Sequence, residues 1–66
     1  MIVKINGKKK EIKKKSSLAE LILAMGLCGK KIVMEHNLCI VPEKEWKKTP
    51  LAENDTVEII SFVGGG

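Results

Sequence analysis

One helix signal stands among segments whose patterns are those of strands. Ser17 followed three residues later by Glu20 is a capping-box pattern, which marks the start of a helix. The apolar residues after it recur at the spacing of one helical face: Leu18, Leu21, Ile22 and Met25. Gly26 then stands where helices often end. A helix over residues 17–25 is predicted, and one helix among several strands favours a small α+β fold.

The strand patterns before the helix indicate a hairpin. Residues 1–5 alternate loosely between apolar and polar side chains, and Asn6-Gly7 is a strong turn signal because both residues tolerate positive φ. The returning segment, residues 9–15, has one apolar residue, Ile12, among charges. We therefore expect an exposed second strand that makes a single inward contact.

Three more strands are expected after the helix. Residues 32–36 and 38–41 are apolar segments separated by a turn at Asn37, and the last strand covers residues 56–62. Residues 43–51 have no strand pattern and allow at most one helical turn near their start. This order is that of a β-grasp, a mixed four- to five-stranded sheet with one helix packed on one face.

In that fold the first and last strands are parallel neighbours at the centre of the sheet, as the handedness of crossover connections favours. A small sandwich or SH3-like barrel is the alternative, and the helix signal counts against it. We expect residues 1–62 to form the β-grasp domain and residues 63–66 to be a flexible C-terminal glycine tail.

The tail, Val63-Gly64-Gly65-Gly66, follows the last strand directly. Glycine has no Cβ and adds nothing to a core, but a run of glycines can enter a narrow active site. One interpretation makes the carboxylate of Gly66 the reacting group, with Gly64 and Gly65 as its side-chain-free approach. The other interpretation is a frayed end or a leftover of expression.

Alternation in the last strand predicts an exposed apolar patch beside the tail. Ile59 should face the core, whereas Ile60 and Phe62 face outward, and Ile2 on the neighbouring first strand would face the same way. An exposed apolar patch usually marks a protein contact; the alternative is that Phe62 folds back over the edge of the core. The predicted partner-binding residues are Ile2, Ile60, Phe62 and Val63.

Size and composition exclude several classes of protein. A domain this small has little core for a substrate pocket, so we expect no independent catalysis. No apolar run approaches the ~20 residues that span a bilayer, and no signal-peptide pattern is present, so we expect a cytoplasmic protein without membrane contact. His36 and Cys39 are only half of a zinc site, and we predict no metal.

Six of the twelve lysines lie between Lys8 and Lys15, and the net charge is +4. These lysines form either a solvated sheet edge that resists aggregation or a docking surface for an acidic protein. A nucleic-acid partner is disfavoured, because the chain has no arginine and its only aromatic residues, Trp46 and Phe62, are distant from the lysines in sequence.

Several stretches together resemble the ThiS family, the ubiquitin-like sulfur carriers of thiamine biosynthesis. The combination of Ile40-Val41-Pro42 with Trp46 and the terminal Val-Gly-Gly-Gly is the most specific part. The lysines of the first hairpin are a departure that the resemblance does not require. The matching stretches follow the family order over nearly the whole chain: residues 3–8, 17–21, 33–37, 40–42, 46, 55–59 and 62–66.

The resemblance implies a chemistry for the tail. In the family, an E1-like adenylyltransferase (ThiF) uses ATP and magnesium to adenylate the carboxylate of the last glycine, here Gly66. Sulfur from cysteine, usually through a cysteine desulfurase, then displaces AMP and leaves a thiocarboxylate, and thiazole synthase (ThiG) takes up that sulfur. ATP and magnesium belong to the partner, so no cofactor is assigned to this chain, which we expect to be monomeric.

Other functions remain open from the sequence. The small subunit of molybdopterin synthase (MoaD) and tRNA-thiolation carriers share the fold, the glycine end and the activation chemistry. A protein modifier would instead be attached through Gly66 to lysines of other proteins. A basic binding module, in which the glycines are incidental, is the alternative from a different class.

Overall fold

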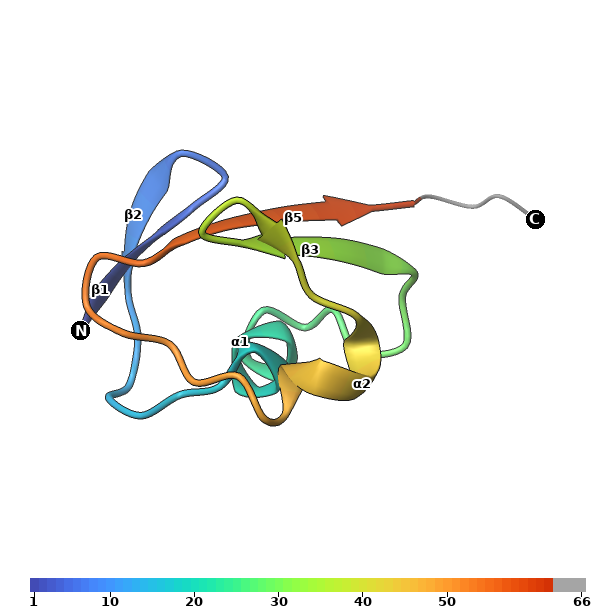
Figure 1. The fold of residues 1–66 in the computed structure, drawn as a ribbon, viewed down its shortest axis with the longest axis horizontal. Coiled ribbons are helices and arrows are strands. Elements are labelled where there is room, and N and C mark those ends of the chain that lie inside the picture. The colour runs from blue at the N-terminus through green and yellow to red at the C-terminus, as the bar shows by residue number, and fades with distance from the viewer. Residues whose placement is uncertain (63–66) are drawn as a thin grey trace.

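Five strands form one mixed sheet, and two helices lie on one of its faces (Figure 1). The computed structural model of the protein describes residues 1–62; residues 63–66 lie outside the described part. The elements, in chain order, are β1 (Ile2–Ile5), β2 (Lys8–Glu11), α1 (Leu18–Ala24), β3 (Ile32–His36), β4 (Cys39–Ile40), α2 (Glu43–Trp46) and β5 (Thr56–Ser61).

The strand order is β2-β1-β5-β3-β4, which places the last strand at the centre of the sheet. β5 is parallel to β1, with Lys4 opposite Thr56, and antiparallel to β3, with Met34 opposite Ile59. The two hairpins, β1–β2 and β3–β4, are antiparallel. The β-grasp and the parallel pairing of the first and last strands are therefore confirmed.

The helix α1 begins and ends as its sequence predicts. The Ser17 hydroxyl accepts a hydrogen bond from the Glu20 backbone N–H at 3.2 Å, and the Glu20 carboxylate accepts one from the Ser17 N–H at 2.9 Å. These reciprocal bonds satisfy two N–H groups that the first helical turn leaves without partners. After the C-cap Met25, Gly26 takes φ = 71°, which a glycine adopts without steric cost.

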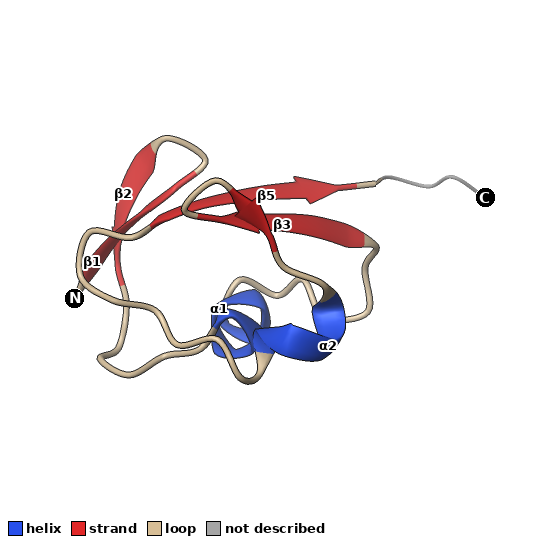
Figure 2. Cartoon of the chain, viewed as in Figure 1, coloured by secondary structure: helices blue, strands red, loops and turns tan. Residues whose placement is uncertain are grey.

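The core lies between the sheet and the helices (Figure 2). Trp46 of α2 belongs to it, and its Nε1–H donates to the Val41 carbonyl at 2.8 Å, so the indole is buried with its polar group satisfied. No helix within residues 1–62 has the length and apolar character needed to cross a membrane. The buried apolar residues are Val3, Ile5, Leu18, Leu21, Ile22, Met34, Trp46, Leu51, Val57 and Ile59.

Two strands, β2 and β4, are shorter than the sequence predicts by two residues or more, and β1 and β5 are each shorter by one. β2 ends at Glu11, and Ile12 beyond it packs against the core while its N–H donates to the Met1 carbonyl at 2.9 Å. β4 begins at Cys39 because Asn37 and Leu38 both take positive φ and form the turn. α2 is the single helical turn that residues 43–51 allow.

Candidate functional site

β5 leads directly to the glycine tail, so the candidate site is built around its end. Its alternation is clear: Val57 and Ile59 are buried, whereas Ile60 and Phe62 are 56% and 60% exposed. Both outward side chains lie on the predicted face, and Phe62 does not fold back over the core. Val63, Gly64, Gly65 and Gly66 lie outside the described residues, and their roles stay predictions.

The expectation that Ile2 lies beside Ile60 and Phe62 is wrong. The parallel register puts Ile2 next to Asn54, whose N–H donates to the Ile2 carbonyl at 2.7 Å. Ile60 is six residues beyond Asn54 in the same strand direction, which at ~3.3 Å per residue is roughly 20 Å away. Ile2 is also partly buried. It belongs to the opposite end of the sheet.

Two other residues take the place of Ile2. Val33 of β3 is directly opposite Ile60, and it is 36% exposed. Ile40 of β4 is opposite Glu35, which is two residues from Val33 along β3 and therefore on the same face, and it is 68% exposed. Alternation around the buried Met34 could have placed Val33 outward. We call the resulting surface on the helix-free side of the sheet the outer apolar face: Val33, Ile40, Ile60 and Phe62.

Asn6 holds β5 where β1 no longer pairs with it. The Asn6 Oδ1 accepts a hydrogen bond from the Ile59 N–H at 2.7 Å, and the Asn6 Nδ2 donates to the Ile59 carbonyl at 3.1 Å. One side chain thus satisfies the two backbone groups of Ile59 that face away from β3. Sequence reasoning identified Asn6 only as a turn residue, and its φ of 50° confirms that role.

A polar cluster fixes the start of β5. The Asp55 carboxylate accepts hydrogen bonds from His36 Nε2 at 2.7 Å, the Ala52 N–H at 2.8 Å and Asn37 Nδ2 at 3.1 Å. Burial raises the pKa of Asp55, but the hydrogen bonds from His36, Ala52 and Asn37 and the charge of His36 outweigh it, so the pKa lies below its ordinary value. Asn37 Oδ1 also accepts the Thr56 N–H at 2.9 Å.

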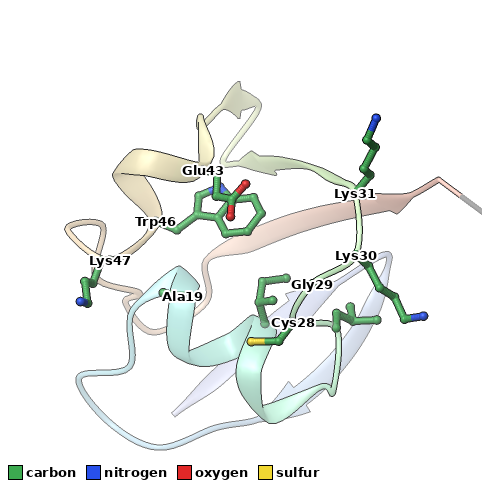
Figure 3. A pocket seen from close by; sticks show the side chains of 10 residues that line it. Ala19, Cys28, Gly29, Lys30, Lys31, Glu43, Trp46 and Lys47 are labelled. Atoms are coloured by element: carbon green, nitrogen blue, oxygen red, sulfur yellow. The ribbon is translucent and has the colours of Figure 1, made fainter.

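A surface hollow of about 420 Å³ lies between α1, the loop after it and α2 (Figure 3). Its wall includes Ile22 and Trp46, and Lys30 and Lys47 stand at its rim. Cys28, an exposed free thiol, lines it too. Within residues 1–62 no three histidine, cysteine or acidic side chains are grouped to hold a metal. The hollow therefore has an apolar wall with three lysines and Glu43 around it.

Comparison with known proteins identifies the family. The model of the ThiS family matches residues 3–66. The sulfur carrier protein ThiS of Bacillus subtilis is 30% identical over 66 residues, a match that covers 98% of this chain and 100% of that protein. The crystal structure of ThiS from Geobacter metallireducens is 25% identical and superimposes with a TM-score of 0.84 over 100% of both chains.

Thiazole synthases are also similar to this chain over part of their length. The thiazole synthase of Paramagnetospirillum magneticum is 31% identical over 62 residues, or 94% of this chain, and that of Magnetococcus marinus is 27% identical over 66 residues, or 100%. This chain spans only 19% and 20% of those two proteins. With the full-length matches to a sulfur carrier and to a solved ThiS structure, the family match is decisive: the chain belongs to the ThiS family.

Proposed function

We propose that this protein is the sulfur carrier of thiamine biosynthesis, with Gly66 as the carrying residue. An E1-like adenylyltransferase activates the Gly66 carboxylate with ATP and magnesium, because a carboxylate is too poor an electrophile to accept sulfur directly. The persulfide that a desulfurase forms from cysteine displaces AMP, and a thiol such as excess cysteine then reduces the resulting acyl disulfide to a thiocarboxylate, which thiazole synthase consumes. The protein is then a recycled co-substrate of larger enzymes and not itself a catalyst.

The position of β5 is the observation that carries this proposal. β5 pairs with strands on both sides, packs Val57 and Ile59 into the core and is bonded by the Asn6 side chain at Ile59. A strand fixed in this way gives the segment that follows Phe62 a rigid base with a defined direction. Gly64 and Gly65 supply a backbone without side chains, so they suit a narrow channel of a partner enzyme.

The outer apolar face is the proposed docking surface for the adenylyltransferase and for thiazole synthase. Its four side chains are exposed; Val33, Ile60 and Phe62 lie toward the end of β5, and Ile40 lies at the level of Glu58, so a partner that covers them also receives the tail. Thiazole synthases that contain a similar segment within their own polypeptide support thiazole synthase as a partner. Val63 extends this surface in the proposal.

The same proposal places the protein in the cytoplasm as a monomer. Cys28 and Cys39 are both free and exposed, which suits a reducing compartment, where thiols are not oxidised to disulfides. Size-exclusion chromatography with light scattering measures the oligomeric state. A stable dimer would contradict the monomer.

Intact mass spectrometry tests the chemistry. The protein is incubated with the adenylyltransferase, ATP, magnesium, cysteine and a desulfurase, and a mass gain equal to the exchange of one oxygen for sulfur is expected. Deletion of Gly66 should abolish the gain. An unchanged mass, while the same enzymes act on a known carrier, would refute the proposal.

A second reaction separates thiazole synthesis from the related functions. The thiocarboxylated protein should lose its sulfur to thiazole synthase and not to molybdopterin synthase or a tRNA-thiolation enzyme. Conjugates of higher mass on other proteins would instead indicate a protein modifier.

A further inference from the structure

The lysines of the first hairpin form one edge of the sheet. β2 is the outermost strand, and all of its residues, Lys8–Glu11, are exposed. Lys8 and Lys10 lie opposite Ile5 and Val3, on the helix side of the sheet, whereas Lys9 lies opposite Lys4 on the other side. We call this surface the lysine edge: Lys4, Lys8, Lys9, Lys10, Lys13, Lys14 and Lys15.

These ammonium groups have no anionic partner within the described part of the chain. The one pair of a basic and an acidic side chain at salt-bridge distance in residues 1–62 is His36–Asp55, far from the hairpin in sequence. Lys4 and Lys9 are directly opposed across β1 and β2, and like charges in that position repel. An anion bound at this edge would relieve that repulsion.

The backbone of β2 is open on the same edge. Met1 and Ile12 exchange both of their backbone hydrogen bonds, at 2.9 Å each, so hydrogen-bonded and non-hydrogen-bonded pairs alternate from there along the hairpin. Lys4–Lys9 is consequently a non-hydrogen-bonded pair, with Cα atoms about 4.5 Å apart. The N–H and C=O groups of Lys9 and Glu11 therefore point away from β1, toward the free edge.

The lysine side chains of β2 alternate between the two sides of the sheet, as side chains of a strand do. Lys8 and Lys10 are two residues apart, about 6.6 Å along the strand, which is the spacing of alternate side chains in an added strand. Lys13, at the start of the second group of lysines, is held by a turn in which the Ser16 hydroxyl donates to the Lys13 carbonyl at 2.8 Å.

We propose that an extended acidic segment of a partner protein binds here by adding a strand to β2. Its backbone pairs with Lys9 and Glu11, while its successive carboxylates meet Lys8 and Lys10 on one side and Lys9 on the other. The lack of any aromatic side chain in the hairpin disfavours a nucleic acid as the ligand.

This surface is separate from the proposed carrier chemistry. β1 lies between β2 and β5 in the sheet, and the β1–β2 hairpin lies toward the N-terminal end of the long axis, whereas β5 runs toward the other end (Figure 1). The added strand would pair with the free edge of β2, which faces away from β5, so its binding does not depend on the sulfur reaction.

Amide NMR of the full ¹⁵N-labelled chain with a capped hexaglutamate peptide tests the proposal. Saturable shifts are expected at residues 8–11, together with slowed hydrogen exchange at the Lys9 and Glu11 amides. Shifts without slower exchange at these two amides would overturn strand addition. This measurement uses the unsubstituted protein, so it does not depend on whether a variant folds.

A matched pair of variants tests whether binding depends on the lysines of β2 or only on the net charge of the protein. The triple substitution K8Q/K9Q/K10Q should weaken peptide binding at least about fivefold, since it removes three exposed ion pairs. The control K44Q/K47Q/K48Q removes the same charge from three exposed lysines in and after α2 and should change the Kd by less than about twofold. Equal weakening by both would mean that only net charge matters and would overturn the proposal.

Two further ligands decide the class of partner. Hexathymidylate and vesicles containing phosphatidylserine present negative charges without a peptide backbone. Weaker binding of both than of hexaglutamate supports a protein segment. Tighter binding of either one overturns it and would identify the lysine edge as a nucleic-acid or membrane contact.

Discussion

Replacing Asn6 with alanine should destabilise the protein by about 3 kcal/mol. The substitution removes both hydrogen bonds to Ile59, each of which contributes about 1 kcal/mol. It also places an alanine at a φ of 50°, a conformation that costs an ordinary residue roughly 1 kcal/mol. For a domain of this size, 1 kcal/mol corresponds to about 4–8 °C in Tm, so a loss of more than about 12 °C is expected.

Two companion variants separate the contributions. Asn6→Gly keeps the positive φ without strain but loses both bonds, so its free energy of unfolding should fall by about 2 kcal/mol. Asn6→Asp keeps the oxygen that accepts the Ile59 N–H but replaces the donor with a carboxylate oxygen that faces the Ile59 carbonyl, so a loss of more than about 1 kcal/mol is expected at neutral pH.

Urea unfolding followed by the fluorescence of Trp46, which is buried and the only tryptophan, measures these differences. If the glycine and alanine variants both stay within about 0.5 kcal/mol of the unsubstituted protein, the bonds to Ile59 do not hold β5. If alanine and glycine are equally destabilising, the φ contribution is absent.

Three other changes test separate parts of the structure. Ser17→Ala removes the side-chain half of the capping box and should lower the free energy of unfolding by about 1 kcal/mol in the same urea assay; no change would mean that the cap contributes nothing. Because the folded pKa of Asp55 lies below its unfolded value, its stabilising effect is complete above about pH 4 and is lost as the pH falls through the folded pKa. Thermal unfolding between pH 2 and 7 should therefore show a smaller acid-induced loss in Asp55→Asn, and an identical pH profile would contradict this assignment. Phe62→Ala should raise the KM for adenylation at least about fivefold, as expected for the loss of a large apolar contact. The control Leu23→Ala, which truncates a 65% exposed side chain on α1, should leave the KM unchanged. Equal effects of the two substitutions would show that the outer apolar face is not the docking surface.

Local patterns predicted the elements well because each depended on neighbours in sequence. The capping box of Ser17 and Glu20 and the turn at Asn6-Gly7 involve contacts within a few residues. The alternation of β5 correctly separated the buried Ile59 from the outward Ile60 and Phe62. The family resemblance, based on short stretches in the right order, is confirmed over residues 3–66.

What the sequence could not supply is the register between distant strands. Alternation predicts which face Ile2 occupies, but not how far it lies from Ile60 along a parallel neighbour. The same limit concealed the pairing of Val33 with Ile60 and the contact of His36 with Asp55, which joins residues 19 positions apart. The hydrogen bonds from Asn6 to Ile59 could not be predicted for the same reason, because the sequence does not indicate which distant backbone groups an amide side chain will bond.

The central place of β5 has a consequence for synthesis of the protein. β5 is translated after every other element, yet β1 and β3 both pair with it, and residues 5 and 57 are 52 positions apart in the chain. Contacts so distant form late, because the intervening loop must close before they can stabilise anything. A nascent chain that stops before residue 56 lacks the middle of its sheet and remains a substrate for proteases. Only chains that have been translated through β5, and so nearly to the terminal glycines, can complete the sheet.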